Sequence, residues 1–175
     1  GIISDSFAKL PIGQCLLPIF ESYEKVDISV VSFSFTLKKD AWTDVFEQNS
    51  SVWFDCTSMG DREFGKVLEE AACDVLIDTF GYACAAGEYF SLRFEHFCNR
   101  KAPLQFMMFG HPLSMGTDIY DLFIADSMLV PTQEEERFYV EKVVRMPTVF
   151  APYAPILPLP QIVPKATVRI RLGST

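Results

Sequence analysis

Short apolar runs rich in β-branched and aromatic residues alternate along this chain with segments whose apolar residues recur at helical spacing. The pattern predicts strands over residues 2–4, 26–35, 52–54, 75–77, 104–109, 122–125 and 148–150. It predicts helices over 11–23, 40–46, 61–72 and 88–98, with Asp40 and Asp61 as N-caps, and one more helix opened by Pro131. Such alternation is typical of βαβ units. We therefore expect a three-layer, Rossmann-like α/β lobe with a mainly parallel sheet and helices on both faces.

The composition changes near residue 150. Six prolines occur between Pro147 and Pro164, too many for a helix or an inner strand. We assign residues 1–150 to the Rossmann-like lobe and residues 151–175 to a proline-rich strap or linker. The apolar residues of the strap predict that it lies along a protein surface. They are Tyr153, Ile156, Leu157, Leu159 and Ile162.

Charge and cysteine content exclude several classes of protein. The formal net charge of −8 disfavours a nucleic-acid partner, which would need a basic face. No run of about 20 uncharged apolar residues, the length of a membrane span, occurs. The five cysteines are an odd number and are widely spaced, which disfavours a disulfide framework or a structural zinc site. We therefore expect free thiols, no metal, and an intracellular, reducing compartment (the cytoplasm or an organelle interior).

Five short motifs follow one another in the second half of the chain. In order, they read DVLIDTFGY at 74–82, RKAPLQ at 100–105, FGHPLSMG at 109–116, DLFIAD at 121–126, and a pattern from Pro131 to Pro147 that contains YVEK. Their order and spacing resemble those of the protein O-GlcNAc transferase and SPINDLY family, glycosyltransferase family 41. Residues 3–7 resemble the start of that family's catalytic region, and residues 167–174 resemble the strand that opens its second lobe.

The resemblance implies a two-lobed GT-B transferase of which this chain matches the N-terminal catalytic lobe. That family transfers a sugar from a nucleotide donor to serine or threonine of proteins without an essential metal or other cofactor. Its second lobe holds most of the donor, and nothing in this sequence corresponds to that lobe. We therefore expect a nucleotide sugar to bind only if a second lobe is present, and no transfer by this chain alone.

One position departs from the family at the centre of its chemistry. Where the family has a histidine that is a candidate for the proton acceptor, this chain has Leu10, which carries no titratable proton. Gln14, the second polar position of that loop, can hydrogen-bond a sugar but cannot act as a base. No catalytic residue is therefore predicted.

The loop after the predicted strand 104–109 supplies the remaining candidates for substrate binding. These are Gly110, His111, Pro112 and Gly116, although a tight turn that needs glycine would look the same. We interpret His96 as a packing or surface histidine. Asp78 and Asp126 are expected to orient loops through backbone amides, and Arg100 and Lys101 to form ion pairs or caps.

These observations leave two main hypotheses of function. The first is a degenerate, non-catalytic lobe that serves as a structural or interaction subunit, bound to other protein chains. The second is a fragment of an active protein O-glycosyltransferase without its nucleotide-binding lobe, which the start at Gly1 and the end at the expected lobe boundary favour. A small-ligand binding module is a third, weaker reading.

Overall fold

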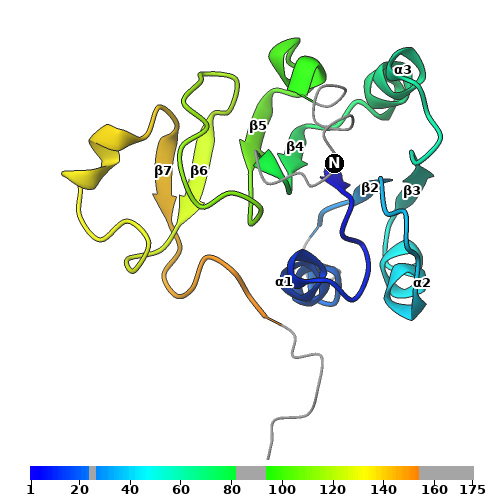
Figure 1. The fold of residues 1–175 in the computed structure, drawn as a ribbon, viewed down its shortest axis with the longest axis horizontal. Helices are drawn as coiled ribbons and strands as arrows, with labels where there is room; N and C mark the ends of the chain where they lie inside the picture. The colour runs from blue at the N-terminus through cyan, green and yellow to red at the C-terminus, as the bar shows by residue number, and fades with distance from the viewer. Residues whose placement is uncertain (24–26, 82–93, 154–175) are drawn as a thin grey trace, which may run out of the picture.

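The computed structural model describes residues 1–23, 27–81 and 94–153. Their seven strands form one all-parallel sheet in the order β3-β2-β1-β4-β5-β6-β7 (Figure 1). The strands are β1 (Ile2–Ser4), β2 (Val31–Ser34), β3 (Val52–Asp55), β4 (Val75–Asp78), β5 (Leu104–Met107), β6 (Leu122–Ala125) and β7 (Lys142–Arg145). The α/β, Rossmann-like fold predicted from the sequence is confirmed.

Helices connect the first four strands. They are α1 (Pro11–Phe20), α2 (Ala41–Gln48) and α3 (Asp61–Ala71), and residues 94–98 form a further helical turn before β5. A 3-10 turn, η3 (Glu135–Phe138), precedes β7. None of the helices in the described part of the chain is long and apolar enough to cross a membrane.

Two separate apolar clusters hold the helices against opposite faces of the sheet. On one face, Phe20 of α1 and Phe46 of α2 pack against Phe7 with edge-on and tilted rings. On the other face, Phe64 of α3 packs against Phe33 of β2. Neighbouring residues of β1 divide between the clusters, Ile2 facing the first and Ile3 the second, because side chains alternate across a strand. The result is the three-layer arrangement.

The starts of α2 and α3 show why one predicted cap is right and the other is wrong. The Asp40 carboxylate accepts the amides of Trp42 and Thr43, and the Thr43 hydroxyl accepts the Asp40 amide, so α2 begins with a capping box. Asp61 is instead the first residue of α3. The N-cap is Gly60, and no side chain bonds the free amides at this end of the helix. The Asp61 carboxylate bonds to a histidine, as described below.

The predicted strand 26–35 is shorter in the structure. The strand begins only at Val31, which pairs with Val52 of β3, and its pairing with β1 begins at Ser32. The carbonyl of Val30 accepts two amides from the β3 side, those of Ser51 and Val52. The Val30 amide donates to the Ser51 hydroxyl, 3.1 Å away. Val30 therefore bonds to Ser51 and Val52 just outside the regular ladder, and the strand does not extend back to it.

The largest differences from the sequence prediction lie between Pro131 and Phe150. Arg145 donates to the carbonyls of Val130 and Thr132, and its guanidinium also contacts Glu136, so the first turn of the predicted helix is fixed as a loop. The segment 142–145, which the sequence analysis did not identify as a strand, is β7. The predicted strand 148–150 is wrong, because the Phe150 amide bonds the Asp126 carboxylate and not a neighbouring strand.

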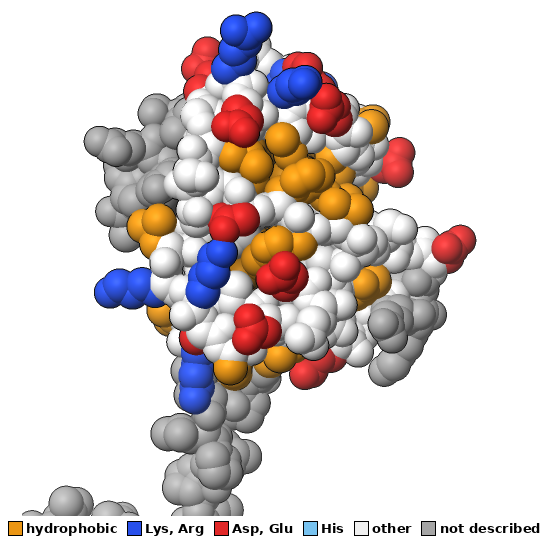
Figure 2. Space-filling model, turned by 90° about the vertical axis from the view of Figure 1, so that its right-hand side faces the viewer, with side chains coloured by type: hydrophobic (Ala, Val, Ile, Leu, Met, Phe, Trp, Pro, Cys, Tyr) orange, Lys and Arg blue, Asp and Glu red, His pale blue; other side chains and the backbone are white. Residues whose placement is uncertain are grey.

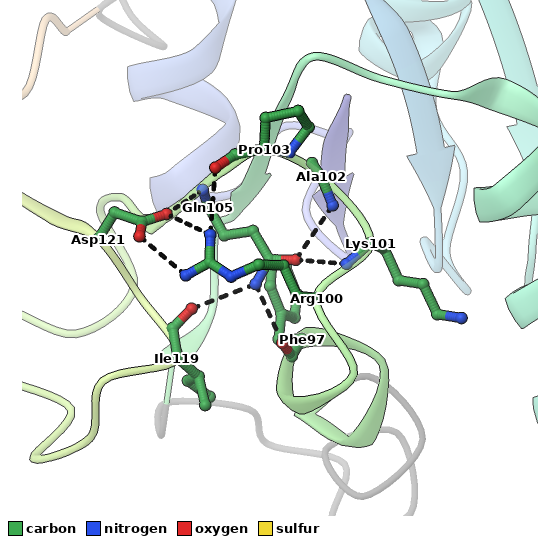
Figure 3. A network of polar contacts seen from close by, with 8 residues as sticks. All are labelled: Phe97, Arg100, Lys101, Ala102, Pro103, Gln105, Ile119 and Asp121. Atoms are coloured by element: carbon green, nitrogen blue, oxygen red, sulfur yellow. Dashed lines mark hydrogen bonds and ion pairs between the residues drawn. The ribbon is translucent and has the colours of Figure 1, made fainter.

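A buried polar network supports the amino ends of β5 and β6 (Figure 3). The side chain of Gln105, fully buried, accepts the Lys101 amide and donates to the carbonyls of Phe97 and Ile119. Arg100 reaches Asp121 through two hydrogen bonds, and the same carboxylate accepts the Gln105 amide. The predicted structural role of Arg100 is thus confirmed. Lys101, also predicted to pair, extends away from this network and bonds Glu69.

The exposed edge strand β3 borders an apolar area. In Figure 2, which faces that side of the molecule, hydrophobic side chains gather across the middle of the view and charged side chains of both signs surround them. Val52 of β3 is among the exposed large hydrophobic residues. At the end of the strand, Asp55 forms an ion pair with Lys39, a charged feature typical of protected sheet edges.

Candidate functional site

The strand order locates the place where a parallel sheet of this kind binds ligands. From β1 the chain builds outward through β2 to β3, and it then returns to start a second series at β4, on the other side of β1. The order therefore reverses between β1 and β4. In open α/β sheets, ligands bind outside the carboxyl ends of the strands at such a reversal. The loops after β1, β4 and β5 meet here.

The loop after β1 is held rigidly by buried hydrogen bonds. The Phe7 amide donates to the Thr36 hydroxyl at 3.0 Å, and the Thr43 hydroxyl donates to the Phe7 carbonyl at 2.7 Å. The Lys9 amide donates to the Asp40 carboxylate. A Cβ on Gly13 would lie 2.0 Å from the Ala8 carbonyl oxygen, so only glycine allows α1 to approach the loop this closely.

This rigid loop presents Leu10 at the N-cap of α1. The leucine side chain is 43 % exposed and forms no cap hydrogen bond. Gln14, one turn later, is 5 % exposed, and its side-chain oxygen has no hydrogen-bond partner among the described residues. A buried amide oxygen without a partner is unfavourable unless a ligand or water supplies the missing donor.

The turn after β4 is fixed by its own side chains. The Thr79 hydroxyl donates to the Ile3 carbonyl and to the Ser4 hydroxyl, which joins β4 to β1 at the reversal point. One oxygen of Asp78 accepts the Phe80 amide, and the other accepts the Tyr120 hydroxyl at 2.8 Å. As predicted, the buried Asp78 orients the turn.

The loop after β5 lies directly against this turn. A Cβ on Gly110 would come within 2.3 Å of the Thr79 carbonyl oxygen and 2.5 Å of that of Phe80. Gly81 has a left-handed φ of +52°, and a Cβ there would lie 2.8 Å from the Cβ of His111. The structure thus brings the half-buried His111 beside the β4 turn. Glycine is required at position 110 because two backbones pack closely there.

The end of the same loop is held by a residue to which sequence reasoning assigned no role. The Glu141 carboxylate, 5 % exposed, accepts the Ser114 hydroxyl and the Met115 amide, both at 2.7 Å. The Ser114 hydroxyl in turn accepts the Gly116 amide. In the sequence, Glu141 stands out only as part of the YVEK motif. The one signal of its role is an acidic residue directly before a strand. Pro112 and Gly116 are exposed.

The two loops that carry the predicted site residues share one apolar cluster. Phe109, just before Gly110, packs against the cluster that contains Phe7 and Leu16. The structure therefore brings the start of α1, with Leu10 and Gln14, and the loop that begins at Gly110 to the same edge of the sheet. The predicted interface residue Tyr153 belongs to no helix or strand, and 63 % of its surface is exposed. Ile156, Leu157, Leu159 and Ile162 lie outside the described residues, as do residues 82–93 and the segment 167–174.

The carboxylates at this edge are engaged in structural hydrogen bonds. Asp126 accepts the amides of Leu129, Phe150 and Met128, and these bonds lower the pKa of its carboxyl group. Asp5 accepts the Ser6 hydroxyl, and Asp55 accepts a hydroxyl and an amide of Thr57. Within the described ranges, no group of three potential metal ligands occurs.

The fold and the position of the site define the class of protein. It is a Rossmann-like lobe whose expected ligand site lies at the carboxyl ends of the strands, where the strand order reverses between β1 and β4. The sequence profile of glycosyl transferase family 41 matches residues 1–163, and the chain belongs to that family. No protein of curated function matches the sequence.

Among solved structures, the chain is similar to a mutant O-GlcNAc transferase from Thermobaculum terrenum. The TM-score is 0.75 at 24% sequence identity, over 87% of this chain and 28% of that protein. This likeness supports the fold. The chain spans less than a third of the length of the protein it matches.

Proposed function

We propose that this chain is a glycosyltransferase-family lobe that has lost its proton acceptor and serves as a non-catalytic interaction subunit of a larger protein assembly. The observation that carries the proposal is Leu10. It stands exposed at the N-cap of α1, at the ligand edge, where the family resemblance places a histidine. A leucine cannot take a proton from an attacking hydroxyl.

Apart from His111 in the loop after β5, the polar groups at this edge do not replace the lost acceptor. Gln14 is an amide, and the carboxylates of Asp78 and Asp126 each accept backbone amides that fix the loops. Using either carboxylate as a base would remove a bond that holds the site together. Lys9, next to Leu10, is exposed, and such a lysine stays protonated near neutral pH.

The assay that tests this proposal uses a radiolabelled UDP- or GDP-sugar and a serine-containing acceptor protein. We expect no transfer by this chain, either alone or mixed with a separately produced second lobe of a family 41 enzyme. Turnover above the buffer level in the mixture would overturn the proposal, because it would show that a proton acceptor remains.

One observation favours the alternative, a lobe of an active protein O-glycosyltransferase that needs a second lobe for its nucleotide sugar. The buried side-chain oxygen of Gln14 lacks a partner, as expected of a group that binds a ligand hydroxyl. If the mixture is active, Leu10→His should raise its rate by about 10²-fold, the usual contribution of a general base, whereas Leu10→Asn should not.

The interaction role rests on the strap. Tyr153 is exposed at its start, and the residues that follow include Ile156, Leu157, Leu159 and Ile162. An exposed apolar side chain such as Tyr153, at the start of a proline-rich segment with many apolar residues, is typical of interfaces. We propose that the strap contacts another protein chain. Light scattering and chemical crosslinking of the purified chain test this. A well-behaved monomer in which the region around Tyr153 crosslinks only within the chain would contradict the proposal.

A further inference from the structure

A crevice lies away from the ligand edge, between α3 and the segment that leads into β5. Its volume is about 390 Å³. Arg62, Gly65, Lys66 and Glu69 line it from one side of α3, at helical spacing, and His96 and Lys101 line it from the other. Figure 2 shows charged side chains of both signs at the top of the molecule, over α3.

His96 is the buried centre of this crevice. The residue is 7 % exposed, and its Nε2 lies 2.8 Å from the Asp61 carboxylate. Its other ring nitrogen, Nδ1, is buried and has no hydrogen-bond partner among the described residues. A histidine that is oriented by a carboxylate through one nitrogen presents the other to a partner of its own.

A glycine in the middle of α3 makes room for the imidazole. A Cβ on Gly65 would lie 2.6 Å from Cε1 of His96 and 3.3 Å from Nδ1. Glycine inside a helix costs about 1 kcal/mol relative to alanine, so its presence here needs a reason. The reason is the ring, which rests on the helix backbone and lies nearly perpendicular to the ring of Phe64. The position of His96 is therefore fixed on three sides.

Three cationic side chains line the crevice on a chain whose net charge is −8. Arg62 and Lys66 come from α3 and Lys101 from the opposite segment. Lys101 pairs with Glu69, whose side chain is 64% exposed, and Lys66 pairs with Glu70 at 3.5 Å with both groups well exposed. Exposed pairs of this kind are weak, so Lys66 is free to turn toward an anion.

We propose that this crevice binds a phosphate group, either free or as a phosphate monoester. The imidazole, bonded to Asp61 through Nε2, forms a hydrogen bond through Nδ1 with one phosphate oxygen. Arg62 and Lys66 contact the remaining oxygens, and Lys101 contributes charge from the other wall. Charge-assisted bonds from several cations to one tetrahedral dianion are the usual chemistry of phosphate recognition.

Imidazole NMR on the full chain tests the proposal directly. The chain has two histidines, so a ¹⁵N-histidine spectrum contains two ring systems, which His111→Gln tells apart. Inorganic phosphate should shift the His96 Nδ1 signal saturably, while sodium chloride of equal ionic strength should not. Arg62→Gln and Lys66→Gln should each weaken binding about tenfold, the value of one charge-assisted contact.

Lys142→Gln is the matched control, because Lys142 is an exposed lysine on the distant strand β7. It should leave phosphate binding unchanged. A phosphoserine peptide, titrated in parallel, identifies the source: tighter binding of the peptide indicates a phosphorylated protein, and tighter binding of free phosphate indicates a small molecule. Absence of a saturable shift at His96, or equal weakening by Lys142→Gln, would overturn the proposal and leave Nδ1 to water.

Discussion

Asp121 illustrates at the scale of a residue how a carboxylate contributes to this fold. Hydrogen bonds from Arg100 first, and from the Gln105 amide, lower the pKa of its carboxyl group. A carboxyl whose pKa is lower in the folded chain stabilises the fold above its unfolded pKa, near 3.9, and loses that contribution as pH falls toward the folded value. The effect belongs to the acid range and should be absent from the pH dependence above about 6.

This gives a prediction for Asp121→Asn. At pH 7 the variant should lose about 1 kcal/mol of unfolding free energy, a modest value because Arg100 is nearly half exposed. The difference from the parent chain should shrink as pH is lowered from about 5 toward 3. Urea unfolding at several pH values measures it, with Asp27→Asn, an exposed aspartate, as control. A difference that stays constant down to pH 3 would contradict the assignment.

Thiol reactivity is a second property fixed residue by residue. Burial raises the pKa of the Cys56 thiol to about 12, so almost no thiolate is present at pH 8. Cys98 is exposed. Iodoacetamide should therefore modify Cys98 in the native chain and leave Cys56 unmodified until the chain unfolds, as peptide mass mapping would show. Fast native labelling of Cys56 would mean that β3 opens readily.

At the scale of elements, the strands with uninterrupted apolar runs were predictable and the segments governed by distant side chains were not. The four residues of β4 lie between Asp74 and a glycine turn, and the prediction of that strand is confirmed. The segment after Pro131 carries strong helix signals, yet it is not an α-helix. Arg145 of β7 instead donates to the backbone carbonyls of Val130 and Thr132. That contact joins residues 13 or more positions apart, and no local pattern encodes it.

The candidate site shows the same division. The motif order indicated which loops meet, and the family match confirms the resemblance on which that rested. The sequence did not reveal what holds the loops, such as the Glu141 carboxylate at Ser114 and Met115. It also gave no sign that Gln14 is buried without a partner, because burial depends on how α1 packs against Ala8.

Glycines of the β5–β6 loop allow a test of the loop packing. Gly110→Ala places a Cβ 2.3 Å from the Thr79 carbonyl oxygen, so the two loops must separate, at a cost of about 2 to 3 kcal/mol. Gly116→Ala meets nothing within 4 Å, and its cost of about 1 kcal/mol comes from the left-handed φ of +68° alone. Thermal unfolding of both variants compares them. Equal losses would show that the loops adapt easily.

At the scale of the molecule, one continuous sheet separates two apolar clusters that share no buried side chain. The cluster around Phe46 includes α1 and α2, and the cluster around Phe64 includes α3 and residues near β5. Both nevertheless depend on β1, whose neighbouring residues Ile2 and Ile3 belong to opposite clusters. Thr79 further joins β1 to β4 by two side-chain hydrogen bonds. A disturbance on one face should therefore reach the other through the central strands.

We accordingly predict a single cooperative unfolding transition that both clusters control. Phe46→Ala and Phe64→Ala, each removing a fully buried ring from a different face, should each cost about 3 to 5 kcal/mol. Differential scanning calorimetry should show one peak that moves to lower temperature in either variant, with equal calorimetric and van't Hoff enthalpies. Phe138→Ala, which removes an exposed ring on η3, should move it little. Two separated peaks in either core variant would show that the faces unfold independently, and that β1 does not couple them.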